Sequence, residues 1–348
     1  MKVQFEKFLN QIQKAENRAI KQAEKTRFPK FFEFSYSDDP PKMVAIDGSN
    51  RWIWYNTDMN ARIAIIRASA VVYEYNSKYE SKLNLVDHDF KDIPVLIAPN
   101  NADMLNYDPE VKSLHQDIKK ALGRRPTARG ILNQLRELEE YKFAEEMALK
   151  YDHSLIVMDG ALTIIQVKQI EDAAKNLREA CIDNQNTLIG VSKRNTTRRL
   201  RSNLTDEAVV KRLTQNDPRM VYTEVRDIPK GKQVYPPLGL TFLAKLHTKP
   251  VKTFRVDIVP QKEEKIRTIF SYLANYSIVD SFLGYPFPLV DAHNIAALLR
   301  RVPEMYNHEL VDAGTGLGIE EEEIFKYLIS HENIERDPFH RHLDEVTR

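Results

Sequence analysis

Two short apolar segments that each end in an aspartate constrain the fold of this chain more than any other feature. The first is MVAID at 43–47 and the second is SLIVMD at 154–159, and a glycine follows each aspartate. Short apolar runs of this kind are typical of strands buried on both faces. Because a mixed or parallel sheet presents its strand ends at one ligand-binding edge, Asp47 and Asp159 are expected to lie close together. The sequence therefore predicts an α/β fold built on a mixed sheet.

The same pair of aspartates predicts a metal site. Two neighbouring carboxylates repel each other unless a cation lies between them, and hard divalent cations prefer oxygen ligands. Mg²⁺ or Mn²⁺ would satisfy both conditions. A strand followed by Asp-Gly is also a common turn in which glycine supplies a positive φ, so either motif by itself is more often a turn than a metal site.

Periodicity and turn signals predict the remaining elements. Helical spacing marks an amphipathic N-terminal helix at 3–27 and further helices at about 109–122, 129–151, 166–185 and 262–280. Strands are predicted at 51–55, 62–75, 94–99, 187–193 and within 253–259. In the segment YPFPLVDAH at 285–293, the prolines predict an extended stretch from 285 to 288. A helix from 289 to 301 would then carry Asp291, His293 and Asn294 in its first turns.

Length and turn signals divide the 348 residues into three parts. Residues 1–40 are expected to form a helical extension, 41–301 the core with a variable insertion at 78–128, and 302–348 a helical segment and tail. The single cysteine, Cys181, excludes an intramolecular disulfide. The sequence contains no apolar run near the roughly 20 residues that cross a bilayer, and its N-terminus lacks the apolar core of a signal peptide. A cytoplasmic protein without membrane association is expected.

The overall charge gives no pull toward nucleic acid, because 51 Lys and Arg residues face 50 Asp and Glu residues. One local segment, KRNTTRRLR at 193–201, is strongly basic. It either neutralises phosphates or is an ordinary solvated loop. Its candidate DNA-binding residues are Lys193, Arg194, Arg198 and Arg199. Arg51 and Trp52 follow Asp47 closely, and a tryptophan there either stacks on a base or packs into the core.

The order of elements and several motifs resemble a known family of nucleases. The predicted elements follow the order found in ribonuclease-H-like metal nucleases. That order is an aspartate on a first strand, a meander, a Glu-rich helix, a second aspartate on a strand and a late polar helix. The motifs AIDGSNR at 45–51, LRELEEYKFAEEMA at 135–148, IVMDGAL at 156–162, GVSK at 190–193 and YPFPLVDAH at 285–293 resemble those of the NurA family. They span most of the chain in the family's order.

This resemblance implies a ribonuclease-H-like mixed sheet flanked by helices. It also implies a homodimer that partners a HerA-type hexameric ATPase and acts on single-stranded DNA and duplex ends. The implied activity is Mn²⁺- or Mg²⁺-dependent 5′-to-3′ exonuclease action with endonuclease action on single-stranded DNA, in end repair or phage defence. Matched by position, the metal and catalytic residues are Asp47, Asp159, Tyr285, His293 and a helix glutamate. That glutamate is Glu140 or, as the second choice, Glu139.

Phosphodiester hydrolysis gives these residues chemical roles. Two ions about 4 Å apart activate the attacking water and stabilise the charge on the transition state and the leaving oxygen. Asp47 would be shared between the ions, with Glu140 and Asp159 completing the cluster. His293 would bind the second ion or transfer a proton, although a histidine at a helix start is more often a surface or cap residue. Lys193 would contact the scissile phosphate, unless it is an ordinary surface lysine.

Two other functions are compatible with parts of the sequence. An actin-like ATPase also opens with an aspartate on a first strand, but it needs several glycine loops, and this chain has only 11 glycines. A non-cleaving subunit that binds DNA or a translocase is the other alternative. The presence of Asp47, Glu139 or Glu140, Asp159 and His293 together favours a cleaving enzyme.

Overall fold

A computed structural model describes residues 2–26, 30–56, 60–78, 82–98, 109–123, 126–163, 167–193, 197–198, 204–225, 238–249, 252–259, 265–297 and 303–325. The strands are β1 (Phe32–Phe34), β2 (Met43–Asn56), β3 (Ala61–Tyr75), β4 (Leu83–Ile97), β5 (Leu155–Asp159), β6 (Thr187–Ser192), β7 (Met220–Glu224), β8 (Leu240–Lys245) and β9 (Phe254–Val259). The helices are α1 (Lys2–Thr26), α2 (Pro109–Leu122), α3 (Ala128–Lys150), α4 (Lys168–Asp183), α5 (Asp206–Thr214), α6 (Ile266–Asn275), α7 (Phe287–Ala297), α8 (Pro303–Gly316) and α9 (Glu321–Phe325), with a short 3-10 helix, Asp280–Phe282.

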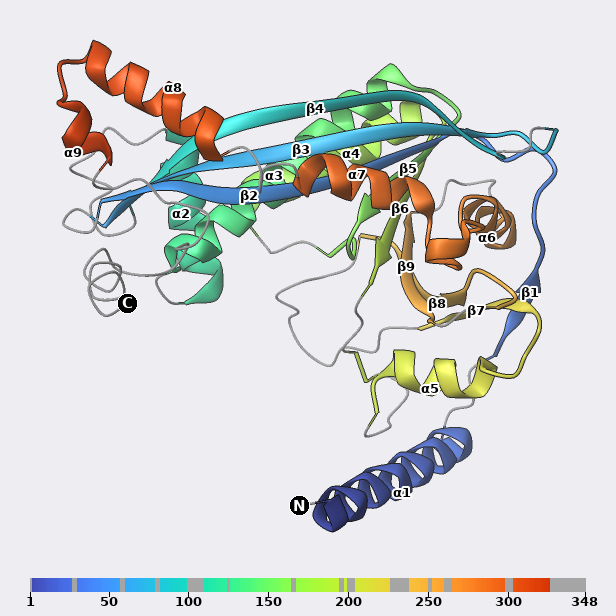
Figure 1. Cartoon of the computed structure of the whole chain (residues 1–348). Coiled ribbons are helices and arrows are strands. Elements are labelled where there is room, and N and C mark those ends of the chain that lie inside the picture. Colours follow the sequence, from blue (N-terminus) through green and yellow to red (C-terminus); the bar gives the residue numbers. More distant parts are fainter. Residues whose placement is uncertain are drawn as a thin grey trace.

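The strands form one nine-stranded mixed sheet in the order β1-β7-β8-β9-β6-β5-β2-β3-β4 (Figure 1). Strands β2, β3 and β4 pair as an antiparallel meander, whereas β5 is parallel to β2 and β6 is parallel to β5. Helices lie on both faces of this sheet. The predicted α/β fold class, a mixed sheet flanked by helices, is confirmed.

Strand β2 continues well beyond Asp47, where the sequence predicts that it ends. The reason is its long pairing with β3, in which Asp47 lies opposite Ser69 and Asn56 lies opposite Ala61. Gly48 is therefore a residue inside a strand and does not form a turn. Strand β5 does end at Asp159, and Gly160 follows with φ of +137°, so only the second Asp-Gly pair behaves as the turn motif indicates.

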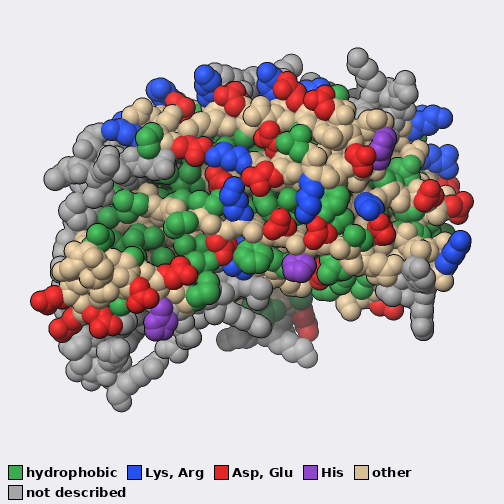
Figure 2. All heavy atoms as spheres, turned by 90° about the horizontal axis from the view of Figure 1, so that it is seen from above, with side chains coloured by type: hydrophobic (Ala, Val, Ile, Leu, Met, Phe, Trp, Pro, Cys, Tyr) green, Lys and Arg blue, Asp and Glu red, His purple; other side chains and the backbone are tan. Residues whose placement is uncertain are grey.

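Strand β4 is longer than the predicted segment at 94–99, since it runs over 15 residues along β3. It is the last strand of the sheet order, and its Leu85, Val86 and Phe90 side chains are exposed. Figure 2 shows the molecule from above the view of Figure 1, in which β4 is the uppermost strand of the sheet. Acidic and basic side chains are intermingled over this face and do not separate by sign.

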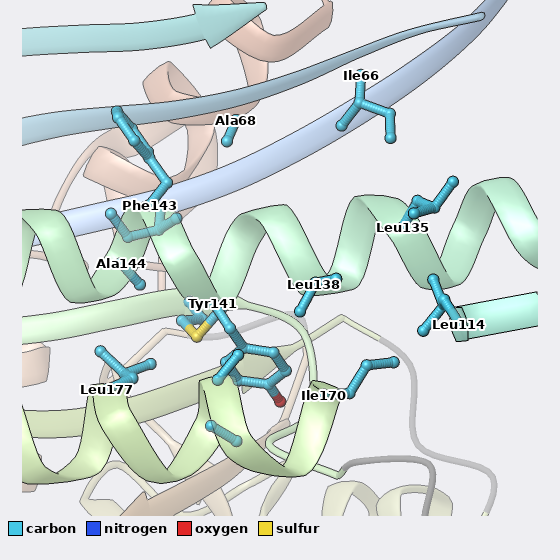
Figure 3. Packing of buried hydrophobic residues seen from close by; sticks show 14 of the residues in the cluster. Ile66, Ala68, Leu114, Leu135, Leu138, Tyr141, Phe143, Ala144, Ile170 and Leu177 are labelled. Atoms are coloured by element: carbon cyan, nitrogen blue, oxygen red, sulfur yellow. The ribbon is translucent and has the colours of Figure 1, made fainter. Parts of the chain in front are cut away.

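Two hydrophobic cores lie on opposite faces of the sheet. On one face, the α3-side core packs helices α2, α3 and α4 against alternate strand residues such as Val44 and Ile46. Figure 3 shows Leu138 and Tyr141 of α3 lying close to Ile170 of α4 in this core. On the other face, the α7-side core packs α6 and α7 against the intervening residues, including Ala45 and Val157. The sheet is thus buried on both sides at its centre.

The sequence analysis missed several elements outside the central strands. Strands β1, β7 and β8 and helix α5 were not predicted, and β1 brings part of the N-terminal extension into the sheet by pairing with β7. Helix α6 is shorter than the predicted 262–280. Helix α7 begins at Phe287, so Pro288 lies inside its first turn, where a proline is tolerated, and not in an extended segment.

The N-terminal helix was predicted correctly, and α1 carries a stripe of exposed apolar side chains at Phe5, Phe8, Leu9 and Ile12. Towards its C-terminal end it contacts α5, where Glu16 pairs with Arg212. None of the helices that the structure describes is both long and apolar enough to cross a membrane.

Candidate metal centre

Three neighbouring strands bring Asp47, Asp159 and Lys193 to the same place. Ile46 of β2 pairs with Met158 of β5, so the next residue along each parallel strand sets Asp47 beside Asp159. Strand β6 pairs with β5 on its other side, and Lys193 directly follows it. Because side chains alternate along a strand, Asp47 and Asp159 point to the same face as Ala45 and Val157, which is the face covered by α7.

Helix α7 and the residues before it complete the cluster. The Nδ1 atom of His293 lies 2.7 Å from Oδ2 of Asp47. The hydroxyl of Tyr285 donates to Oδ1 of Asp159 at 3.0 Å, and Nζ of Lys193 donates to Oδ2 of the same carboxylate at 2.6 Å. The Lys193 ammonium also lies 5.3 Å from the centre of the Tyr285 ring. Asp159 is therefore held by two donors, and Asp47 by His293 and by the amide of Gly48 at 2.8 Å.

The donor set fits a divalent cation. Three residues, Asp47, Asp159 and His293, each offer one ligand atom, and these atoms all lie within 4.8 Å of one another. Asp47 is 6% exposed, and burial together with the charge of Asp159 raises the pKa of its carboxyl group. A cation between the two carboxylates would remove this electrostatic cost. Oxygen and imidazole donors at this separation suit Mn²⁺ or Mg²⁺.

A glutamate approaches the same cluster from the opposite face of the sheet. Glu140 of α3 is buried and lies against Gly48, where a Cβ atom would come within 2.7 Å of its Cγ and 2.8 Å of its Cδ. Burial raises the pKa of Glu140 to about 8, and the charges of Asp47 and Asp159 act in the same direction. Arg136, one turn earlier in α3, forms an ion pair with Glu140 and donates to the carbonyl of Gly48 at 3.2 Å.

The geometry separates the two glutamates that helical spacing left open. Glu139 pairs with Lys142 at 2.9 Å, and Lys142 in turn binds Glu110 of α2. Glu139 therefore faces the α2 side of the helix, whereas Glu140 faces Gly48. Sequence reasoning missed Arg136, although its position four residues before Glu140 is the spacing of a helical ion pair. It also missed Glu137, whose pKa is raised to about 7 by burial.

The predicted DNA-binding residues lie in different environments. Arg51 is 8% exposed, two residues beyond Ser49 on the α7 face of β2. Trp52 is half-buried against the α3-side core, and the Arg62 guanidinium lies 5.4 Å above its ring. Arg198 is exposed. Arg194 and Arg199 lie outside the described residues, as does Arg201 of the same basic segment.

Comparison with known proteins agrees with this fold. Residues 41–298 match the family model of the NurA domain. The crystal structure of the NurA nuclease from Sulfolobus solfataricus is similar, with 20% identity, a TM-score of 0.53, and coverage of 92% of this chain and 99% of that one. A second crystal structure of NurA shares 11% identity, with a TM-score of 0.45 and coverage of 84% of this chain and 91% of that one. Comparison with curated protein sequences gives no significant match. Because the family model covers most of its length, the chain belongs to the NurA domain family.

Proposed function

We propose that this protein is a divalent-metal-dependent deoxyribonuclease. The observation that carries the proposal is the convergence of Asp47, Asp159 and His293 from β2, β5 and α7 on one small volume. Membership of the NurA domain family supports DNA as the substrate. The specific activity proposed is 5′-to-3′ exonuclease action on duplex ends together with endonuclease action on single-stranded DNA.

Each residue of the site has a defined part in this chemistry. Asp47 and Asp159 would hold the ion, which would supply Lewis-acid activation of the phosphate and of the attacking water. Tyr285 fixes the orientation of the Asp159 carboxylate through its hydroxyl. Lys193 places a positive charge beside that carboxylate, where it neutralises charge on the phosphate. His293, bonded to Asp47 through Nδ1, binds an ion or moves a proton.

A second ion is proposed on the Glu140 side of Asp47. The Glu140 carboxylate acts electrostatically on the same cluster from α3, and its raised pKa marks a buried acid that a cation would stabilise in the charged form. Asp47 would then be shared between the two ions, with Asp159 and Glu140 as the outer carboxylates. Two ions held in this way would assist the attacking nucleophile and the leaving oxygen of phosphodiester hydrolysis.

The test is cleavage of labelled DNA by the purified full chain. Single-stranded and duplex substrates, labelled at either the 5′ or the 3′ end, are incubated with Mn²⁺, Mg²⁺ or EDTA. Metal-dependent loss of label from the 5′ end is expected, with none in EDTA. Asp47→Asn and Asp159→Asn should each reduce cleavage below detection. Asp152→Asn, on the exposed turn before β5, is the matched control and should cleave as the wild type does.

Two results would contradict the proposal. Wild-type protein that binds DNA but does not cut it, alone or with its translocase, would indicate the non-cleaving role instead. Full activity in Asp47→Asn or Asp159→Asn would refute the metal site.

The proposed assembly is a homodimer that works with a HerA-type hexameric ATPase. Light scattering after size-exclusion chromatography measures the first, and co-purification with the ATPase encoded in the same genome measures the second. The exposed stripe of α1, formed by Phe5, Phe8, Leu9 and Ile12, is a candidate contact surface. Replacing Phe8 and Leu9 with serine should weaken one of the two assemblies. Assembly of this variant at wild-type affinity in both measurements would exclude the α1 stripe.

A further inference from the structure

Helix α7 rests on polar side chains of the sheet at four points. Ser49 of β2 and Arg67, Ser69 and Tyr73 of β3 all point to the face that α7 covers, and we call these four residues the α7 seam. Ser49 donates to the carbonyl of Ala296 at 2.6 Å, Arg67 to that of Ile295 at 3.3 Å and Ser69 to that of Ala292 at 2.8 Å. The hydroxyl of Tyr73 donates to the carboxylate of Asp291.

Three of these contacts fix main-chain atoms of the helix. Ile295 and Ala296 belong to the last turn of α7 that the structure describes. Arg67 and Ser49 therefore hold this end of the described helix. Apolar contacts such as those of Leu289 permit small sliding movements, whereas donors aimed at particular carbonyls define the rotation and translation of the helix.

Ser69 links the backbones of Asp47 and His293, whose side chains meet at 2.7 Å in the site. Its side chain is fully buried, and its hydroxyl lies 3.1 Å from the carbonyl of Asp47 as well as 2.8 Å from that of Ala292, the neighbour of His293. The hydroxyl has one hydrogen, and the shorter distance identifies Ala292 as the main acceptor. Ser69 thus lies between the backbone of Asp47 and the backbone that carries His293.

Arg67 connects the seam to a helix beyond the matched NurA domain. Its guanidinium binds both carboxylate oxygens of Asp92 on β4, at 2.6 and 2.5 Å, and it is 4% exposed. The Tyr306 hydroxyl of α8 donates to the same carboxylate. The bidentate pair uses Nε and Nη2 and so fixes the orientation of the guanidinium. Nη1 is thereby directed at the carbonyl of Ile295.

From these contacts we propose that the α7 seam consists of positioning residues that set His293 against Asp47 and thereby determine the affinity of the metal centre. This inference rests on the proposed function, because it assigns the seam a role at the same ion site. Three seam residues act through the backbone of α7, and Tyr73 acts through the side chain of Asp291.

The test compares Ser69→Ala with the wild-type full chain in two measurements. Hydrogen exchange followed by mass spectrometry should show faster exchange in peptides covering 287–297 and unchanged exchange in α3. Calorimetric titration with Mn²⁺ should show affinity reduced about five- to tenfold, the loss expected when one buried hydrogen bond is removed. Ser154→Ala is the matched control, because Ser154 is 2% exposed and donates to the Asp152 carbonyl at the opposite end of β5.

The outcomes separate this inference from the proposed function. Wild-type protein that fails to bind Mn²⁺ would contradict the proposed function. Wild-type binding with equal affinity in Ser69→Ala would overturn the positioning role alone, whether or not α7 exchanges faster. If Ser69→Ala does not fold, Ser49→Ala replaces it, because Ser49 is half-buried and contacts the helix end. The same loss of Mn²⁺ affinity is expected there, and wild-type affinity in that variant would equally refute the inference.

Discussion

The two faces of the sheet contribute to the metal centre in different ways. On the α3 side, the packing between helix and sheet is mostly apolar, and Glu140 lies against Gly48 together with its ion-pair partner Arg136. On the α7 side, the sheet itself supplies serine, arginine and tyrosine side chains that bind the helix backbone. The α3 face is thus a mainly hydrophobic layer with one ion pair, Arg136 and Glu140, at Gly48, and the α7 face adds hydrogen bonds from the sheet to the helix backbone.

The two kinds of packing differ in how far they stabilise the fold and in how exactly they position the side chains of the site. A hydrophobic layer is nondirectional and stabilises roughly in proportion to buried area, so it holds α3 without defining its position to a fraction of an ångström. Hydrogen bonds are directional, so the α7 side defines where His293 lies. The acid on the α3 side is instead placed by its ion pair with Arg136 and by steric fit against Gly48, and four variants examine this contrast.

The largest effect is expected from Glu140→Gln. Loss of this charge should reduce kcat at least about a hundredfold, the scale at which removal of one preorganised electrostatic group slows an enzyme. Glu139→Gln is the matched control, because its side chain binds Lys142 and faces α2, and its activity should stay within about twofold of the wild type. Both are measured by steady-state cleavage of single-stranded DNA. Equal losses in the two variants would show that the α3 face acts only through general packing.

Gly48→Ala should disturb the steric fit itself. The added methyl group would lie within 2.8 Å of Cδ of Glu140, so the carboxylate must move. Overpacking of this kind costs about 1–3 kcal/mol of unfolding free energy, and we expect a fall in cleavage of about tenfold. Gly316→Ala, which has open space around its Cβ position, is the control for chemical denaturation and cleavage. A Gly48→Ala protein with wild-type activity would mean that Glu140 needs no particular position.

Tyr285→Phe examines the α7 side with a smaller change. It removes the hydrogen bond to Asp159 and leaves the ring in place, so kcat should fall about fivefold, corresponding to the loss of one hydrogen bond. Tyr276→Phe is the matched control, since the buried hydroxyl of Tyr276 donates to the Pro41 carbonyl and not to a carboxylate of the site. Tyr276→Phe should lower Tm without lowering kcat. A fall in Tm alone for Tyr285→Phe would assign its hydroxyl a purely structural role.

The smallest expected effect is on the pH dependence of stability, through Glu137, the partly buried acid next to Arg136. Burial raises the pKa of Glu137 from 4.5 to about 7. The stability that this group contributes is therefore fully present below pH 4.5 and is lost as the pH rises to about 7. Glu137→Gln mimics the neutral form. The difference in Tm between this variant and the wild type, measured in EDTA, should therefore increase between pH 4.5 and about 7 in favour of the variant and stay constant above that. A constant Tm difference between pH 5 and pH 8 would contradict the raised pKa.

Local periodicity was sufficient for the elements that carry their own signal. Helices α3 and α4 and strands β5 and β6 were predicted from apolar spacing because each buries a full face or both faces. Strands β7 and β8 are short and gain their stability from neighbours far away in sequence, so no local pattern revealed them. The length of β2 was missed for the same reason, since its continuation depends on register with β3 and not on residues 47–49.

The site was predictable to the extent that its residues lie in motifs. Asp47, Asp159 and His293 were named from sequence, and the structure brings them together. The choice between Glu139 and Glu140 required the packing of α3 on Gly48, which a helical repeat cannot supply. Nothing in the sequence marked Ser69, because the role of a serine within an apolar strand depends on the helix that packs across that strand.

Strand β4 has a consequence for the behaviour of the protein in solution. It is a long terminal strand with exposed Leu85, Val86 and Phe90, and such an edge is a template for aggregation unless charges interrupt it. Asp87 and Asp89 lie between these apolar residues and serve as gatekeepers. Hydrogen bonds from Lys150 and Tyr151 hold the pKa of Asp87 at about 2, so one gatekeeper keeps its charge even in strongly acidic buffers. This edge therefore keeps a charged residue among its exposed apolar side chains in acidic solution.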